Sequence, residues 1–313
     1  MVPLWLQALV LGVVQGLSEF VPVSSSAHLV LVPHLLGWQA PRLAFDVALH
    51  MGTLAAALLY FRRDLAAMIV AVVRRSDTAE ARLHRRLAVL LVIGSIPVAV
   101  IGLLLGTRIE QVFQSPAITS ALLFVTAALL FAGEKVRDHR VTVATGLPEA
   151  PVDSRARCAR STATVVTQTR ALQVGRDGCD PTGATLAEMS LKHALVIGAI
   201  QSVALLPGVS RSGSTITGGI FAGLTREAAT RFSFLLSIPA LVGAGLLKVA
   251  DLTEVGGYTA VEIAVGVTAA FVAGYAAIRW LVALVAHERL TGFAWYCLAA
   301  GTIGLLGVTL FGS

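Results

Sequence analysis

One stretch of this chain reads Glu19-Phe-Val-Pro-Val-Ser-Ser-Ser-Ala-His28, and a second reads Pro207-Gly-Val-Ser-Arg-Ser-Gly-Ser-Thr215. Each places ionisable or hydroxyl side chains, together with helix-breaking proline, in a segment that is otherwise apolar enough for a lipid bilayer. An ionisable side chain at the centre of a bilayer costs on the order of 2.5–3.5 kcal/mol by insertion scales. Such groups persist there only in contact with each other, water or a ligand, so the two stretches predict a functional site inside a membrane fold.

The composition of the whole chain is that of an integral membrane protein. Of its 313 residues, 56% are hydrophobic and 13% are charged, whereas soluble domains carry about 25% charged residues. Aromatic residues are scarce and no strand-like alternation recurs, which favours helices. The net charge of +6 comes from arginines in loops, where they set orientation and contact anionic headgroups, so bilayer lipid rather than nucleic acid is the expected partner. The predicted fold is all-α and polytopic.

The apolar segments predict about six full transmembrane helices and at least two broken ones. The full-length segments lie at 44–61, 87–106, 116–133, 231–250, 258–278 and 292–312. Residues 3–36 and 190–223 are instead interrupted by proline and serine. We expect them to form re-entrant helical hairpins whose tips, 22–26 and 207–213, stop near mid-membrane, because broken backbone at that depth must be buried in protein or line a cavity.

The two halves of the chain resemble each other. Gly12, Gln15, Pro22 and Ser24 are repeated as Gly198, Gln201, Pro207 and Ser210. We interpret this as an internal duplication, although chance similarity between glycine-rich apolar sequences is the alternative. The predicted organisation is one membrane repeat over 1–136, a flexible cytoplasmic loop over 137–187, and a second membrane repeat over 188–313.

Arginine placement predicts the orientation. Residues 62–86 contain seven arginines, and residues 134–192 contain seven arginines and two lysines. Two spans separate these segments, so both can lie in the cytoplasm, as the positive-inside rule requires. Three full spans per half then invert the second repeat relative to the first, with a site at the repeat interface near the midplane and both termini outside the cytoplasm.

Serines stand where a half-helix would begin in each hairpin: Ser24, Ser25, Ser26, Ser210, Ser212 and Ser214. Serine is a favoured N-cap, and the free N–H groups of a helix N-terminus bind anions. The planar guanidinium of Arg211 can grip phosphate oxygens through two nitrogens, while Gly213 lets backbone approach a ligand and Thr215 adds a hydroxyl. We therefore expect a cage for a phosphate or diphosphate, the alternative being serines that only cap helices and join them.

Three further side chains are candidates for chemistry. Gln15 and Glu19 lie four residues apart on one helix face, where they can bind a divalent cation or present a carboxylate to a water or a hydroxyl. His28 lies one turn after Ser25 and can act as a general base or acid. Ser25 is the candidate nucleophile, activated by His28 or Glu19, and direct attack by water remains the alternative.

A second pair spaced four apart, Asp46 and His50, lies in the apolar run over residues 44–61. The sequence leaves open whether these two side chains line the site or join helices by hydrogen bonds.

These motifs resemble those of the bacterial undecaprenyl-diphosphate phosphatase family, the membrane enzymes linked to bacitracin resistance. The matching motifs are Gln15-Gly-Leu-Ser-Glu19, Pro22-Val-Ser-Ser-Ser-Ala-His28 and Pro207-Gly-Val-Ser-Arg-Ser-Gly213. The similarity runs over nearly the whole chain except about 137–187. Three departures from the family pattern are Gln15 in place of a frequent carboxylate, Ala27 in place of a frequent glycine, and His50 in place of an expected glutamine.

The resemblance implies a hydrolase that removes the terminal phosphate of undecaprenyl diphosphate and so recycles the lipid carrier of peptidoglycan synthesis in the bacterial cytoplasmic membrane. It also implies a divalent cation, Mg²⁺ or Ca²⁺, and a site open to the extracytoplasmic side. A homodimer is compatible with the sequence. The rival from another class is a transporter or lipid flippase, because inverted repeats with broken helices are typical of transporters, but transport requires no nucleophile and base.

Overall fold

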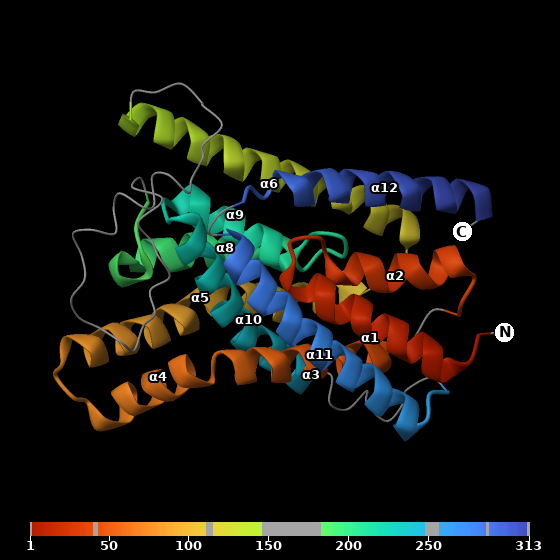
Figure 1. Cartoon of the computed structure of the whole chain (residues 1–313), viewed down its shortest axis with the longest axis horizontal. Coiled ribbons are helices and arrows are strands. Elements are labelled where there is room, and N and C mark those ends of the chain that lie inside the picture. The colour runs from red at the N-terminus through yellow and green to blue at the C-terminus, as the bar shows by residue number, and fades with distance from the viewer. Residues whose placement is uncertain are drawn as a thin grey trace.

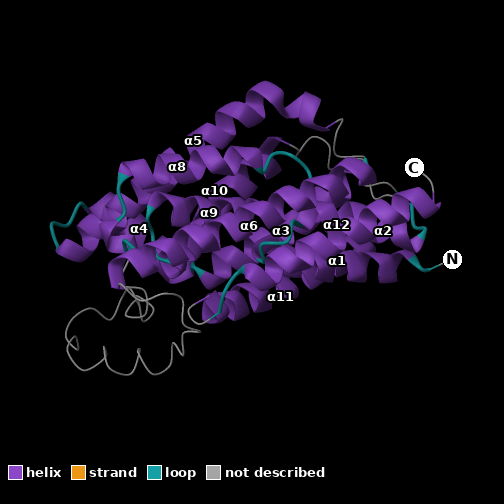
Figure 2. Cartoon of the chain, turned by 90° about the horizontal axis from the view of Figure 1, so that it is seen from above, coloured by secondary structure: helices purple, strands orange, loops and turns teal. Residues whose placement is uncertain are grey.

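The computed structural model of the chain describes residues 2–39, 43–110, 115–145, 183–247, 257–285 and 288–311. Apart from an isolated bridge between Ala184 and Leu224, the regular structure in these ranges is helical, which confirms the predicted all-α fold (Figures 1 and 2). The elements are α1 (Leu4–Phe20), α2 (Ser25–Leu36), α3 (Leu43–Tyr60), α4 (Arg62–Arg74), α5 (Ala79–Glu110), α6 (Pro116–Thr145), the 3-10 turn η2 (Leu186–Glu188), α8 (Leu191–Val203), α9 (Arg211–Ala222), α10 (Arg226–Leu247), α11 (Ala260–Val285) and α12 (Thr291–Phe311).

Within the described residues, five helices are long and apolar enough to cross a membrane, namely α5, α6, α10, α11 and α12. The sixth expected span forms α3, whose segment Ala44–Tyr60 is a shorter apolar helix. The shorter apolar helices Leu4–Phe20, Ser25–Leu36 and Leu191–Val203 belong to the two interrupted segments. The structure is therefore that of a multi-pass membrane protein with five long helices and a set of shorter ones.

Both interrupted segments form helical hairpins. In the first, α1 ends at Phe20 because Val21 takes an extended conformation (φ −66°, ψ 136°), as the residue before a proline tends to do. In the second, Ser210 begins α9 as its N-cap, and the Ser210 Oγ accepts a hydrogen bond from the Gly213 N–H at 3.1 Å. The sequence thus predicted the breaks correctly, since each coincides with a proline.

The tips of the two hairpins meet. The Gly208 N–H donates to Ser26 Oγ at 3.3 Å, and Ser212 Oγ donates to the Val21 carbonyl at 3.1 Å. In Figure 1, α1 and α2 reach inward from the end of the molecule that carries both termini, while α8 and α9 lie toward the opposite end. The broken backbone of each hairpin is therefore hydrogen-bonded partly by the other, as buried backbone groups require.

Two close helix contacts join the first half of the chain to the second. Helix α1 packs along α11, and α8 packs along α5. A Cβ added to Gly12 would lie 2.3 Å from the Gly266 carbonyl oxygen, and one added to Gly198 would lie 2.2 Å from that of Gly94. The glycines that matched in the sequence, Gly12 and Gly198, thus both allow a helix backbone to touch its neighbour.

The segment expected to be a flexible loop over 137–187 is partly ordered. Helix α6 continues to Thr145, because its polar residues have partners there: Arg289 donates to Asp138, and Arg140 donates to the Ile220 carbonyl. At the other end of the segment, the Ala184 N–H donates to the Gly223 carbonyl at 2.9 Å. Residues 146–182 lie outside the described residues.

The ends of the molecule differ in character. The labelled N- and C-termini lie at one end in both views, and the arginine-rich α4 lies at the other (Figures 1 and 2). This arrangement agrees with the separation of arginines from the termini that the sequence predicted.

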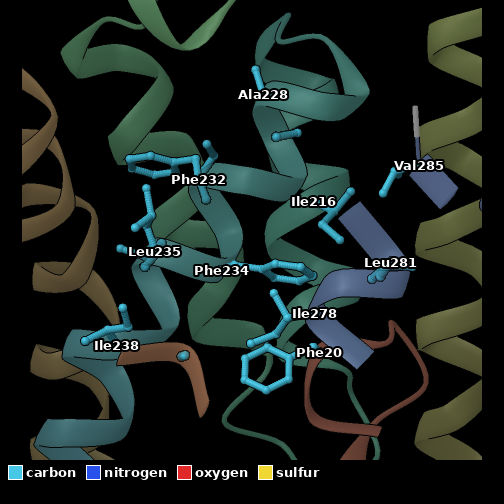
Figure 3. Close-up of a cluster of buried hydrophobic side chains, with 14 of the residues drawn as sticks. Phe20, Ile216, Ala228, Phe232, Phe234, Leu235, Ile238, Ile278, Leu281 and Val285 are labelled. Atoms are coloured by element: carbon cyan, nitrogen blue, oxygen red, sulfur yellow. The ribbon is translucent and has the colours of Figure 1, made fainter. Parts of the chain in front are cut away.

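A cluster of buried hydrophobic side chains joins α1, α9, α10 and α11 (Figure 3). At its centre Phe20 and Phe234 pack edge to face with their ring centroids 5.5 Å apart. Both rings are fully buried, and each directly follows a polar residue, Glu19 and Ser233. Close packing of the rings therefore fixes the backbone that carries these two polar side chains.

Candidate active site

Glu19 lies at the centre of the polar site, at the end of α1. Its Oε2 accepts a hydrogen bond from Ser25 Oγ at 2.7 Å and another from Gln15 Nε2 at 3.0 Å. Its Oε1 accepts one from Arg211 Nη2 at 2.9 Å. Because only 5% of this side chain is exposed, these three donors replace the hydration that the carboxylate loses on burial.

Arg211 connects the two hairpins as the first residue of α9. Besides the Glu19 carboxylate, its Nη2 contacts the Glu19 carbonyl oxygen at 3.3 Å, and its Nη1 contacts the Ser233 carbonyl oxygen at 3.3 Å. Both terminal nitrogens of the guanidinium are thus engaged, and these contacts fix the orientation of the Arg211 side chain. Ser233 was not identified from the sequence, because a single serine in the apolar α10 carries no distinguishing signal.

The first serine cluster has a strained backbone. Ser24 has φ 70° and ψ 98°, a conformation that L residues rarely adopt and that costs of order 1–3 kcal/mol. It caps α2 by accepting a hydrogen bond from the Ala27 N–H at 3.4 Å, and its hydroxyl lies 3.2 Å from Ser26 Oγ. The turn places Ser25 at the start of α2 with its hydroxyl directed at Glu19. Backbone strain of this kind is typical of functional sites.

The second cluster joins the hairpins and forms the N-terminus of α9. The Ser210 and Ser212 hydroxyls lie 3.1 Å apart, and Thr215 Oγ1 donates to the Arg211 carbonyl at 2.8 Å and contacts the Ser233 hydroxyl. Gly213 lies against both tips: a Cβ added there would be 3.1 Å from Ser210 Cβ and in ordinary contact with Pro22 Cβ at 3.5 Å. These residues therefore hold Arg211 and the helix N-terminus close to the first tip, where an anion would bind.

Thr126 on α6 was also missed by the sequence analysis. Its hydroxyl donates to the Gly208 carbonyl at 3.0 Å and accepts from the Ser210 N–H at 2.9 Å. Thr126 therefore holds the backbone of the second hairpin tip against α6.

His28 does not face the candidate nucleophile. Its Nδ1 lies 2.7 Å from the Ser24 carbonyl oxygen, and its Nε2 lies 2.7 Å from the Tyr296 hydroxyl on α12. Among the described residues, the hydrogen-bond partner of the Ser25 hydroxyl is Glu19. Of the two bases that the sequence left open for Ser25, the structure brings Glu19 into contact with it. It pairs His28 with Tyr296, a residue that no motif indicated.

The structure also places the Asp46 and His50 pair. His50 Nδ1 contacts the Asp46 carbonyl oxygen at 2.7 Å, and His50 Nε2 lies 3.5 Å from Glu19 Oε2. His50 therefore lines the site, on the side of Glu19 that carries Oε2.

Comparison with known proteins identifies the family of this chain. The protein family described as "Bacitracin resistance protein BacA" matches residues 8–303. This chain belongs to that family. A relative in Desulfosudis oleivorans, named undecaprenyl-diphosphatase, is 40% identical, with 98% of this chain and 97% of the relative aligned. Relatives in Geobacter metallireducens (undecaprenyl-diphosphatase, 39% identical, 98% and 97% aligned) and Streptomyces avermitilis (undecaprenyl-diphosphatase 2, 36% identical, 95% and 92% aligned) are similar over the same length.

A divalent cation at this site of the BacA family member would take most of its ligands from substrate and water, and the Gln15 amide would have to turn to offer its oxygen beside Glu19, because its nitrogen now faces that carboxylate. The described residues contain no group of three or more His, Cys, Asp or Glu that could hold a metal ion by itself. However, the buried Gln15 Oε1 has no hydrogen-bond partner in the described structure, and its amide lies against Glu19. One amide oxygen and one carboxylate, completed by phosphate oxygens, suit an ion such as Mg²⁺.

Proposed function

We infer that this chain is a membrane phosphatase that hydrolyses undecaprenyl diphosphate to undecaprenyl phosphate and phosphate. The reaction recycles the lipid carrier of peptidoglycan synthesis and confers bacitracin resistance. The family assignment and the names of the relatives support the substrate. The observation that supports the chemistry is the Ser25 hydroxyl at 2.7 Å from Glu19, whose other oxygen is held by Arg211.

In the mechanism that we propose, the Ser25 oxygen attacks the terminal phosphorus and its proton moves to Glu19 Oε2. The bridging P–O bond breaks, and undecaprenyl phosphate leaves with the electron pair. Water then attacks the phosphoserine, the bond between phosphorus and the Ser25 oxygen breaks, and Glu19 returns its proton to that oxygen. Both hydrogens of the water stay with the phosphate, which is released as H₂PO₄⁻. The short hydrogen bond between Ser25 and Glu19 supports this sequence, because a general base must lie within about 2.6–3.2 Å of its proton donor.

Arg211 and the N-terminus of α9 would stabilise the charge on the transferring phosphoryl group. The guanidinium is held by Glu19 and Ser233, so it needs little reorganisation when substrate binds. The hydroxyls and backbone of Ser24, Ser26, Ser210, Ser212, Gly213 and Thr215 form the surrounding phosphate cage.

A divalent cation, Mg²⁺ or Ca²⁺, would be held by Glu19 and Gln15. When bound, it would neutralise part of the diphosphate charge and polarise a phosphoryl oxygen. The partnerless Gln15 Oε1 supports this assignment. His50 stands 3.5 Å from Glu19 and would limit the space on that side of the carboxylate.

We propose that the site opens to the extracytoplasmic side of the bacterial cytoplasmic membrane. The support is the position of the termini and of α1 and α2 at the end opposite the arginine-rich α4 (Figure 1), which the positive-inside rule assigns to the cytoplasm. All proposed site residues come from one chain, so the chemistry does not require the homodimer that the sequence allows.

The transporter hypothesis draws support from the same pair of meeting hairpins, a feature shared with transporters. It gives no reason for a serine hydroxyl to be held against a buried carboxylate. The two readings differ in one measurable quantity, which is the inorganic phosphate released.

The decisive experiment measures phosphate release from undecaprenyl diphosphate by the purified protein, with and without Mg²⁺ or Ca²⁺. Ser25→Ala should abolish turnover. Ser95→Ala is the matched control, because Ser95 hydrogen-bonds only its own helix at Leu91, and it should retain turnover. Rapid quenching followed by mass spectrometry should find phosphate on Ser25. Wild-type turnover in Ser25→Ala would instead favour direct attack by water, and binding without phosphate release would favour transport.

A further inference from the structure

We propose that Tyr296 is a positioning residue of this active site, which acts through His28 to hold the Ser24 backbone that presents Ser25. The proposal rests on the proposed function, since it assigns Ser25 a place in the reaction. It concerns a residue on α12 that lies far along the chain from either hairpin, and it gives His28 a role other than proton transfer with Ser25.

The first step of the argument concerns the two ring nitrogens of His28. The Ser24 carbonyl, 2.7 Å from Nδ1, can only accept a hydrogen bond, so Nδ1 must carry a proton. In the neutral imidazole Nε2 is then an acceptor, and the Tyr296 hydroxyl at 2.7 Å donates to it. The two rings are also nearly parallel, with centroids 5.6 Å apart and planes 9° apart. The Ser24 carbonyl therefore sets the tautomer, and Tyr296 holds the imidazole in the orientation that keeps Nδ1 on that carbonyl.

The second step concerns the reason why Ser24 needs such a partner. Its φ of 70° is rare for a residue with a Cβ, and the positive φ persists only where the surroundings impose it. The N-cap bond to Ala27 is long, at 3.4 Å, and the bond from the His28 N–H to the Ser24 carbonyl is equally long. The side-chain bond from His28 at 2.7 Å is the shortest contact on Ser24 and thus the main restraint on its carbonyl.

The third step connects this restraint to the reaction. Ser24 directly precedes Ser25, so a rotation of the Ser24 backbone moves the Ser25 hydroxyl away from Glu19. Removing the Tyr296 hydroxyl would leave Nε2 of His28 free to find another donor, and the ring could turn away from the Ser24 carbonyl. Because a displacement of about 1 Å in a reacting group can cost a factor of 10² in rate, the loss should appear in kcat, while the diphosphate cage and hence KM change little.

The experiment compares Tyr296→Phe with Tyr275→Phe, a tyrosine on α11 that contacts Tyr60 rather than the site. Tyr296→Phe keeps the ring stack and removes only the hydroxyl. We expect its kcat to fall by between about 10- and 100-fold with KM and the thermal midpoint nearly unchanged, and Tyr275→Phe to match wild type.

A double-mutant cycle separates positioning from a general loss of structure. Glycine adopts a positive φ without strain, so in a Ser24→Gly background the His28 contact no longer has to offset strain at this residue. In that background, Tyr296→Phe should lower kcat by less than about threefold. Such a difference between the two backgrounds shows that the two residues are coupled, because the effects of independent sites add. Equal costs in both backgrounds would overturn the proposal, as would wild-type kcat in Tyr296→Phe.

A measurement that does not depend on turnover distinguishes this proposal from the proposed function. Nitrogen-15 NMR of protein labelled at histidine should show His28 with its proton on Nδ1 in the wild type, and a mixture of tautomers or an added proton in Tyr296→Phe. If the wild-type protein lacks phosphatase activity but the His28 signal changes in Tyr296→Phe, the proposed function is wrong while the Tyr296–His28 contact is supported. An unchanged His28 signal in Tyr296→Phe would reject the positioning role, whatever the activity.

Discussion

Replacement of Glu19 by glutamine is the sharpest test of the active site. Glutamine has nearly the same shape, but it offers one acceptor oxygen where the carboxylate offers two. In the structure, Oε1 serves Arg211, and Oε2 serves both Ser25 and Gln15. Glu19→Gln therefore removes the base and also leaves at least one of these donors facing an NH₂ group.

The size of the effect follows from these contacts. Loss of a general base costs about 10²–10⁴ in rate, which is about 2.7–5.4 kcal/mol at 1.36 kcal/mol per decade. Loss of the charge-assisted bond to Arg211 would add about 1.5–3 kcal/mol if the two effects were independent, but they share one carboxylate and will not add fully. We therefore expect kcat to fall by at least about 10³-fold. KM should change far less than kcat, because most of the affinity comes from the prenyl chain and the phosphate cage, whereas Glu19 acts on the reacting group.

The assay is phosphate release by the purified protein, with kcat and KM determined separately and the thermal midpoint measured on the same sample. Glu262→Gln is the matched control, because Glu262 accepts from the Thr259 N–H at the start of α11 and lies outside the site. It should keep wild-type turnover. If Glu19→Gln retains more than a tenth of the wild-type kcat in a folded protein, Glu19 is not the base and the proposed mechanism is wrong.

Four further outcomes are expected. Arg211→Lys should lower kcat by at least about 10²-fold although the charge is kept, because one ammonium cannot occupy both guanidinium positions; near-normal turnover would make the guanidinium structural. Gly198→Ala should lower the thermal midpoint strongly, since the new methyl group would meet a backbone oxygen at 2.2 Å, whereas Gly243→Ala, with no atom within 4 Å, should not. Gln201→Leu should raise the free energy of unfolding by about 1–3 kcal/mol, because both polar atoms of that buried amide lack a partner in the described structure; a lower stability in denaturation would show that bound water satisfies them. Replacing residues 146–182 by a short Gly/Ser linker should leave phosphate release near wild type, because the sequence there has no apolar period; loss of activity in a folded deletion protein would assign that segment a role in substrate handling.

The sequence by itself determined the features that depend on local chemistry. The length of the apolar segments predicted the membrane helices, because a helix must be long enough to cross the bilayer. Pro22 and Pro207 predicted the breaks, because proline disrupts the helix only at the residues next to it. Ser25, Glu19 and Arg211 could be found because polar groups at membrane depth are costly wherever they occur. The end of α6 was misjudged for the converse reason: its last turns are polar and are supported by partners far along the chain, such as Arg289.

Only the tertiary structure decided which of these groups touch. In the structure, the Ser25 hydroxyl hydrogen-bonds to Glu19, and His28 contacts Tyr296, which lies 268 positions later in the chain. It also brought His50 within 3.5 Å of Glu19, a question that the sequence had left open. Periodicity indicates which face of a helix is polar, but the neighbour of that face depends on how helices pack and cross. Here those crossings depend on backbone contacts between helices from remote parts of the chain, such as α8 with α5, which a single sequence does not specify.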